Sequence, residues 1–459
     1  MASKAPPAQP ETRPSESRTP TLERFVEAQA SGGTLLLWAI AVGALAGLVG
    51  GLFRLSVTAA ASGLAGAGQT FAAQGLPGWL FPVVSTALLV ALAVWLVQRF
   101  APEARGSGVQ EIEGALDGLR PVRWWRVLPV KFAGGVMALG AGMVMGREGP
   151  TIQMGGAVGR MLSDLFHRSD EDAHTLVAAG AGAGLAAAFN APLAGVLLVI
   201  EEMRPQFHYS VVSVQCVLVA CATADMVVRL LLGGQAVIPM VAYPTPDAEV
   251  MWIFLLLGAG FGLLGLAFNA TLFRLVDLFE RVPPAARWFA GAGVGAGIGL
   301  LAWLDPDLVG GGYRAISDAL GGRVVAAGLV GLCLARFFIT LVCFASGPPG
   351  GIFAPLLALG TLLGLAVGDF AQSLPLHGMP DAGVFVVAGM GALFSATVRA
   401  PITGIVLAVE LTGNYALILP VTLACVGATV VAHRLGGRPV YTVLLERALR
   451  SEDASAKAA

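Results

Sequence analysis

The stretch Ala191-Pro192-Leu193-Ala194-Gly195, with Glu201 six residues after it, recurs as Ala400-Pro401-Ile402-Thr403-Gly404, with Glu410 six residues after it. Each copy places a proline inside a long apolar segment. Proline disrupts the interior of a helix but is favoured in its first turn. Each copy therefore predicts a helix that stops and restarts, and the chain contains this break twice.

Two further pairs of segments match in the same register. They are Ala179-Gly180-Ala181-Gly182-Ala183 with Ala388-Gly389-Met390-Gly391-Ala392, and Gly146-Arg147-Glu148-Gly149-Pro150 with Gly351-Ile352-Phe353-Ala354-Pro355. Small residues pair by chance in membrane helices, but three segments in one register indicate two repeats, at about 32–232 and 250–445. Transporters built from inverted repeats of broken helices show this pattern and bind their substrate near the membrane midplane.

The composition is that of a protein embedded in lipid. Of its 459 residues, 56% are hydrophobic and 12% are charged, and the net charge is −1. Soluble domains carry roughly 25% charged residues, so this composition excludes a water-soluble enzyme. The balanced charge argues against a nucleic-acid partner. The five cysteines lie in apolar stretches without metal-ligand or disulfide spacing, so we expect no metal site.

The apolar segments predict an all-α, polytopic membrane domain over residues 32–445. Several are shorter than the ~20 residues that cross a bilayer, which predicts broken or re-entrant helices. Basic residues at 120–131 and 434–438 predict cytoplasmic faces, because Lys and Arg are enriched there. Residues 1–31 are polar, with no signal-peptide core, and are expected to be a disordered cytoplasmic tail. Residues 446–459 are expected to be a short cytoplasmic tail.

Three of the interruptions are suited to an anion. A helix that begins inside the membrane directs unpaired N–H groups and a positive dipole end at whatever precedes it. The segments 146–150 and 351–355 are predicted to be such helix starts, because glycine permits close approach and proline favours the first turn. Gly106-Ser107-Gly108 is a third, in which Ser107 offers a hydroxyl donor.

Two acidic positions are candidates for proton movement. Glu148 stands in the middle of one helix start, where its charged form would compete with a mobile anion and its protonated form would leave. A structural pair with Arg147 is equally consistent with the motif. Glu201 and Glu202 close a long apolar helix, and one of them is a candidate to pass protons to Glu148. A solvated pair of charges at a helix end is the simpler interpretation of these residues alone.

At these positions the sequence resembles the CLC family of chloride channels and transporters, most closely its bacterial proton/chloride exchangers, from about residue 35 to 445. The resemblance implies a three-segment selectivity filter. Its residues are Gly106, Ser107, Gly108, Val109 and Gln110; Gly146, Arg147, Glu148, Gly149 and Pro150; and Gly351, Ile352, Phe353, Ala354 and Pro355. Val109-Gln110 stands where family members often have Ile-Pro, which leaves that helix start less fixed.

The resemblance also implies roles for individual residues. Ser107 and Tyr441 would coordinate chloride through their hydroxyls, and Ile352 and Phe353 through backbone amides. Glu148 matches the external gating glutamate of the family. The second acid of the Glu201-Glu202 pair matches its internal proton-transfer glutamate.

The function implied is secondary active exchange of chloride for protons, without a cofactor or an enzymatic reaction. The resemblance further implies a homodimer in which each subunit holds its own pathway. It places this multi-pass protein among the lipids of a bacterial inner membrane, with both termini in the cytoplasm and a role in acid resistance.

Three alternatives remain on sequence grounds. A passive voltage- or pH-gated chloride channel has the same fold, but Glu202 favours exchange because channels of the family tend to lack an acid there. A fluoride or nitrate transporter is disfavoured by Ser107, Pro150 and Tyr441. An intramembrane hydrolase is disfavoured because the chain has neither His-Glu-x-x-His nor Gly-x-Ser-x-Gly.

Overall fold

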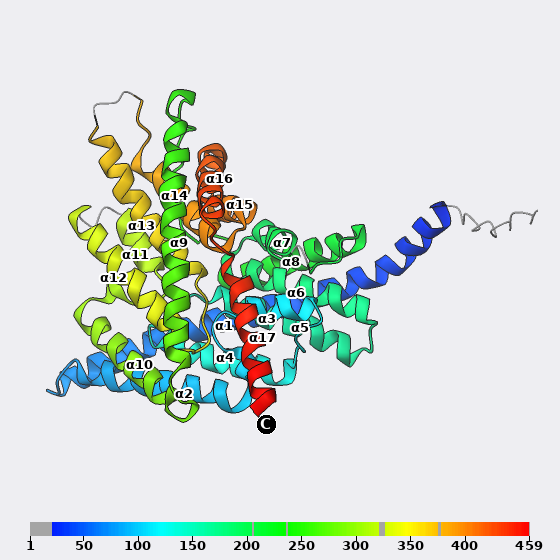
Figure 1. Ribbon diagram of the computed structural model, residues 1–459, viewed down its shortest axis with the longest axis horizontal. Helices are drawn as coiled ribbons and strands as arrows, with labels where there is room; N and C mark the ends of the chain where they lie inside the picture. The colour runs from blue at the N-terminus through cyan, green and yellow to red at the C-terminus, as the bar shows by residue number, and fades with distance from the viewer. Residues whose placement is uncertain (1–20, 204–205, 236, 321–325, 375–377, 459) are drawn as a thin grey trace, which may run out of the picture.

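The computed structural model describes residues 21–203, 206–235, 237–320, 326–374 and 378–458. In these ranges the chain forms seventeen α-helices and no β-strand. They are α1 Thr21–Ala73, α2 Leu80–Phe100, α3 Val109–Leu116, α4 Trp124–Gly140, α5 Glu148–Leu165, α6 Asp170–Phe189, α7 Pro192–Glu201, α8 Val211–Leu232, α9 Trp252–Glu280, α10 Arg287–Leu304, α11 Tyr313–Leu320, α12 Ala326–Ala345, α13 Phe353–Gln372, α14 Ala382–Val398, α15 Pro401–Thr412, α16 Ile418–Arg434 and α17 Val440–Ala458. Figure 1 shows helices running in many directions rather than in one parallel bundle. The predicted all-α fold with tilted helices is confirmed.

Helices of membrane-spanning length occur beside much shorter ones. Eight helical segments within the described ranges are long and apolar enough to cross a membrane. The helices α7, α14 and α15 are apolar but shorter. A helix that is too short to cross the membrane leaves backbone N–H and C=O groups unpaired within it. Such helix ends are tolerated only where protein or a cavity surrounds them. The interrupted apolar segments of the sequence thus correspond to broken helices packed inside the protein.

The terminal helices extend beyond the bounds that composition suggested. α1 begins at Thr21, so the predicted disordered tail is wrong for residues 21–31, whereas residues 1–20 lie outside the described part. The stretch Glu27-Ala28-Gln29-Ala30 consists of strong helix formers, which explains the earlier start. At the other end α17 continues through Ala458, so the segment predicted as a C-terminal tail continues a helix.

The duplicated break is built in the same way in both halves. The C-cap residue that follows α6 is Asn190, with φ 52°, and the one that follows α14 is Arg399, with φ 76°. Each of these left-handed residues is followed by one alanine and then by the proline that opens α7 or α15. Residues other than glycine seldom adopt the left-handed conformation. Its occurrence at both breaks shows that the two halves repeat in structure as well as in sequence.

The helix pairs that precede the breaks also match. α5 packs on α6, and α13 packs on α14. A Cβ atom on Gly155 would lie 2.1 Å from the carbonyl oxygen of Gly180, and one on Gly360 would lie 2.4 Å from that of Gly389. Such contacts are too short for any larger residue, so glycine permits the close crossing in both pairs.

The helices α7 and α15 cap each other. The Glu410 carboxylate, on α15, accepts the backbone N–H of Ala194 (2.8 Å) and of the residue before it (3.2 Å) at the start of α7. In return Glu201, on α7, accepts the N–H of Thr403 (2.6 Å) and of the residue before it (2.9 Å) at the start of α15. A carboxylate there satisfies unpaired donors and complements the helix dipole. These crossed caps join the two repeats at equivalent points.

We expect Glu410→Ala to lower the free energy of unfolding by about 2 kcal/mol, because a side-chain cap contributes roughly 0.5–2 kcal/mol and hydrogen bonds to charged groups are the stronger kind. Chemical unfolding of the purified protein in detergent measures this loss. Glu249→Ala, at an exposed position outside the crossed caps, is the control. Equal losses in the two variants would contradict a stabilising role for the caps.

Candidate anion and proton site

The three predicted helix starts at 106–110, 146–150 and 351–355, called the interrupted segments below, meet through backbone hydrogen bonds. Gly146 and Gly351 exchange N–H···O bonds of 2.7 Å in both directions. The carbonyl of Gly106 accepts the N–H of Gly350 at 3.0 Å. The N–H of Gly106 donates to the carbonyl of Pro348 at 3.3 Å. The first and second segments are therefore both fixed to the third, although the sequence separates the first from the third by more than half the chain.

Ser107 lies against the start of α5, in a segment held by the buried Lys131. A Cβ atom on Gly149 would lie 2.2 Å from Ser107 Oγ, so glycine is what lets α5 begin against this serine. On the other side, the Nζ of the buried Lys131 donates to the carbonyls of Ala104 (3.0 Å) and Gly106 (2.7 Å). These contacts fix the segment that carries the serine.

Two buried hydroxyls are neighbours at this point. Ser107 lies before α3 and Tyr441 on α17, and both are fully buried. The two hydroxyls approach each other, and neither has any other hydrogen-bond partner among the residues that the structure describes. The Tyr441 ring stacks on Phe353, at the start of α13, with 5.9 Å between centroids. Buried hydroxyls are normally well paired, so two adjacent hydroxyls with no other partner and no carboxylate bonded to them suit an anion.

The start of α13 supplies backbone donors to the same region. Ile352 is the N-cap and Phe353 the first residue of α13, and both are fully buried. The first N–H groups of a helix have no partner within it. One of them, on Ala354, donates to Glu148 Oε2 at 3.3 Å. The glutamate carboxylate thus already lies at an anion-binding helix start.

Glu148 has a second donor, which sequence reasoning missed. It is fully buried at the start of α5, and its Oε1 accepts the hydroxyl of Tyr313, on α11, at 2.8 Å. Tyr313 is 165 residues from Glu148 in sequence and lies outside the three interrupted segments. The only local signal for it was the glycine run 310–312 immediately before it.

Arg147 does not form the structural ion pair that the motif also allowed. Its Nε donates to the carbonyl of Ala188 at 3.3 Å, and its guanidinium lies 4.9 Å from the centroid of the Tyr313 ring. No ion pair joins Arg147 to Glu148 in the described structure. The carboxylate is held by a hydroxyl and a backbone N–H instead.

The two adjacent acids at the end of α7 have different surroundings. Glu201 caps α15, as described above, so its carboxylate has a structural role. Glu202 lies beside the buried carboxyl group of Glu113, on α3. Neighbouring buried carboxyl groups disfavour each other's ionised form, so such a pair is suited to carrying a proton. Glu113 was not singled out as a functional residue from the sequence.

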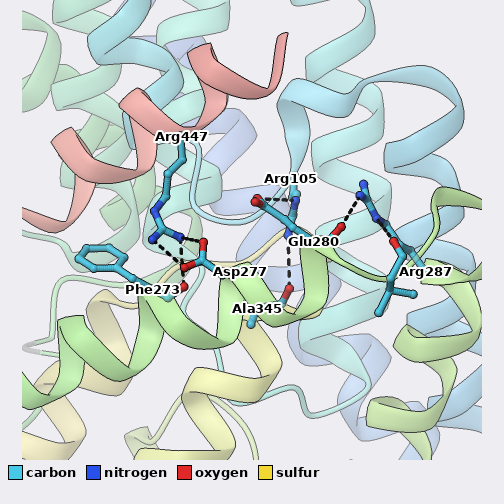
Figure 2. Close-up of polar contacts among 8 residues, drawn as sticks. Arg105, Phe273, Asp277, Glu280, Arg287, Ala345 and Arg447 are labelled. Atoms are coloured by element: carbon cyan, nitrogen blue, oxygen red, sulfur yellow. Dashed lines mark hydrogen bonds and ion pairs between the residues drawn. The ribbon is translucent and has the colours of Figure 1, made fainter. Parts of the chain in front are cut away.

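Two arginines, Arg105 before Ser107 and Arg447 on the helix of Tyr441, bind acidic residues of α9, and Figure 2 shows both contacts. Arg447 of α17 donates to both oxygens of Asp277 (2.5 and 3.1 Å) and to the carbonyl of Phe273 (3.0 Å). Arg105, just before the first interrupted segment, pairs with Glu280 at 3.5 Å. A cavity of about 550 Å³ adjoins these arginines and reaches Gly106 and Gln110 of that segment.

Comparisons with known proteins agree with this geometry. The profile of the family described as "Voltage gated chloride channel" matches residues 87–433. The H(+)/Cl(-) exchange transporter ClcA of Vibrio parahaemolyticus is 50% identical over 435 residues, which cover 94% of this chain and 93% of that protein. ClcA of Vibrio cholerae is 49% identical over the same shares of the two chains.

A solved structure is similar over nearly the same length. The crystal structure of a slow cyanobacterial Cl−/H+ antiporter superposes with a TM-score of 0.88 at 42% identity, covering 91% of this chain and 99% of that one. Because the family profile matches most of the sequence, the chain belongs to the voltage-gated chloride channel family, the CLC family that its three interrupted segments resemble.

Proposed function

We propose that the protein is a secondary active antiporter that exchanges chloride for protons. The observation that carries this proposal is the position of the Glu148 carboxylate, which accepts the Ala354 N–H at the start of α13. A chloride ion is attracted to the start of the same helix, so the carboxylate and chloride compete for one positive helix end. Protonation removes the charge of Glu148 and with it the attraction. Proton binding is thereby coupled to chloride binding.

Chloride binds, in this proposal, between the hydroxyls of Ser107 and Tyr441 and the backbone amides of Ile352 and Phe353. The unpaired, buried state of both hydroxyls supports this assignment. The cavity that reaches Gly106 is the inner approach to the site. Arginine side chains on its wall attract anions, which favours chloride over cations there. The reaction needs no cofactor, because charge competition alone links the two ions.

Protons follow a separate inner route through Glu202. Its position beside the buried Glu113 carboxyl group supports this role, because neighbouring buried carboxyl groups favour the protonated form of one of them. Glu201 is unsuited, since its carboxylate accepts the N–H groups at the start of α15. Glu148 and Glu202 are thus the two proton-transfer residues, and chloride and protons share only the part of the path at Glu148.

Purified protein in liposomes tests the proposed exchange. An outward chloride gradient is imposed, the membrane voltage is clamped with valinomycin and potassium, and the external pH is recorded. Uphill proton movement driven by chloride is the expected result. Chloride flux without proton movement would show a passive channel and would leave Glu202 as a helix-end charge.

Tyr441→Phe is expected to weaken chloride binding about tenfold, because a hydrogen bond to a charged group contributes roughly 1.5–3 kcal/mol and 1.4 kcal/mol is a tenfold change in affinity. The stacking on Phe353 is retained by the phenylalanine ring. Isothermal calorimetry measures the affinity, with Tyr415→Phe at an exposed position as the control. Unchanged affinity would reduce Tyr441 to a packing residue.

We also propose that two copies form a homodimer through α7, α8, α15 and α16, which pack beside one another. These helices carry many exposed apolar side chains, among them Leu193, Val211, Leu218, Met226, Leu230, Ile402, Ile418, Val426 and Val430. Ile402→Trp is expected to yield monomers in detergent by light scattering. Leu88→Trp, on the exposed face of α2, should leave dimers. Chloride flux should persist in the monomer, because each subunit holds its own pathway.

The protein spans the membrane several times, and we propose that this membrane is the bacterial inner membrane, with both termini in the cytoplasm. The basic residues at 120–131 support this orientation, because Lys and Arg are enriched in cytoplasmic loops. Coupled exchange can expel protons from an acidified cell, so acid resistance is the proposed role. Reduced survival of a deletion strain at low pH would support that role, and unchanged survival would contradict it.

A further inference from the structure

We infer that Tyr313 is a positioning residue whose hydroxyl holds the ionised Glu148 side chain in the anion site. This inference rests on the proposed competition between Glu148 and chloride. The hydroxyl donates to Oε1 at 2.8 Å, while the Ala354 N–H donates to Oε2 at 3.3 Å. Each carboxylate oxygen therefore has its own donor, and the shorter bond comes from the tyrosine.

Tyr313 is fixed by a buried guanidinium. Arg336 of α12, only 1% exposed, donates to the carbonyls of Asp307 (2.7 Å), Val309 (3.2 Å) and Gly310 (2.8 Å) in the loop before α11. The N–H of Gly310 in turn donates to the carbonyl of Gly142 at 2.8 Å. That residue lies in the segment leading to α5. The loop that presents the tyrosine is thus tied directly to the segment that presents Glu148.

The hydroxyl distinguishes the two forms of Glu148. A hydrogen bond to an ionised acceptor is shorter and about twice as strong as one between neutral groups. The bond therefore weakens when Glu148 takes up a proton, and the side chain is released. The charged and titratable side chains around this contact are Arg147, Arg54, Tyr313 and Tyr441, while α13 faces it with the Ala354 N–H. Removing the Tyr313 hydroxyl alone leaves all the charges in place.

The test is Tyr313→Phe, which keeps the ring beneath the Arg147 guanidinium and removes only the donor. Proton-coupled chloride flux is measured in liposomes from acidic to alkaline pH. The pH of half-maximal flux is expected to move about one unit toward alkaline pH, since one unit is a tenfold change in proton affinity. The coupling of protons to chloride should persist, because the carboxylate remains. Tyr415→Phe is the matched control and should leave the pH profile unchanged.

Chloride binding gives a second readout. Because the ionised side chain competes with chloride, loosening it should tighten chloride binding severalfold by calorimetry at neutral pH. Chloride affinity and pH profile both unchanged in Tyr313→Phe would overturn the inference.

A double variant separates a specific role from general packing. The effect of Tyr313→Phe on chloride flux should vanish in a Glu148→Ala background, since the hydroxyl then has no carboxylate to hold. An equal effect in both backgrounds would show a packing role and overturn the inference. Persistent coupling in Glu148→Ala alone would instead reject the proposed function. Loss of coupling there, together with an unshifted Tyr313→Phe profile, would reject only the tyrosine assignment.

Discussion

Replacing Glu148 with alanine should leave chloride crossing the membrane while proton transport falls to the background of protein-free vesicles. The carboxylate is the only acidic group that bonds to the start of α13 in the described structure. Without it, chloride meets no tethered competitor and the proton has no carrier at this point. Simultaneous recording of chloride and pH in liposomes measures both fluxes.

Glu148→Gln is a second variant, whose side chain has nearly the size of the glutamate. Its amide fills the space of the side chain but carries no titratable charge, so it should also uncouple the two ions. Faster chloride flux in the alanine variant than in the glutamine variant would reflect the volume of the side chain. Proton coupling in either variant would show that another group carries the proton.

Glu202→Gln should stop proton transport while chloride still passes, which is the second large effect. The amide cannot release or take up a proton, so the pair with Glu113 no longer transfers one. The neighbouring Glu201→Gln is the matched comparison, because it changes the preceding residue by the same chemistry. It should keep proton coupling and lower stability by about 1 kcal/mol through a weakened helix cap.

The reversed pattern would be equally informative. Loss of coupling in Glu201→Gln with normal coupling in Glu202→Gln would move the inner proton route to the first acid of the pair. It would also mean that capping of α15 and proton transfer compete for one carboxylate. The ratio of proton to chloride flux in each variant decides between these results.

The three interrupted segments were predictable because local backbone rules determine them. Glycine beside a first-turn proline marks a helix start, and the duplicated Ala-Pro motif marks a helix break. These rules act over a few residues, so one sequence suffices. They predicted the starts of α5 and α13, together with the position of Glu148 at a helix start.

The contacts that the sequence did not reveal join residues far apart in the chain. Tyr313 meets Glu148, Glu113 meets Glu202, and Glu410 caps a helix 216 residues away. No local pattern predicts these contacts, because each depends on how separate helices pack. The early start of α1 was missed for a different reason: the polar composition of the first residues hid a short run of strong helix formers.

The crossed caps also determine when each repeat can finish folding during synthesis. When α7 leaves the ribosome, the glutamate that will cap it has not yet been translated, and each N–H group left unsatisfied in a lipid environment costs several kcal/mol. The first repeat therefore passes through the translocon in an incomplete state and is completed only when α15 arrives. Neither half is expected to fold stably alone, whereas two separately expressed halves should stabilise each other once they meet in the membrane.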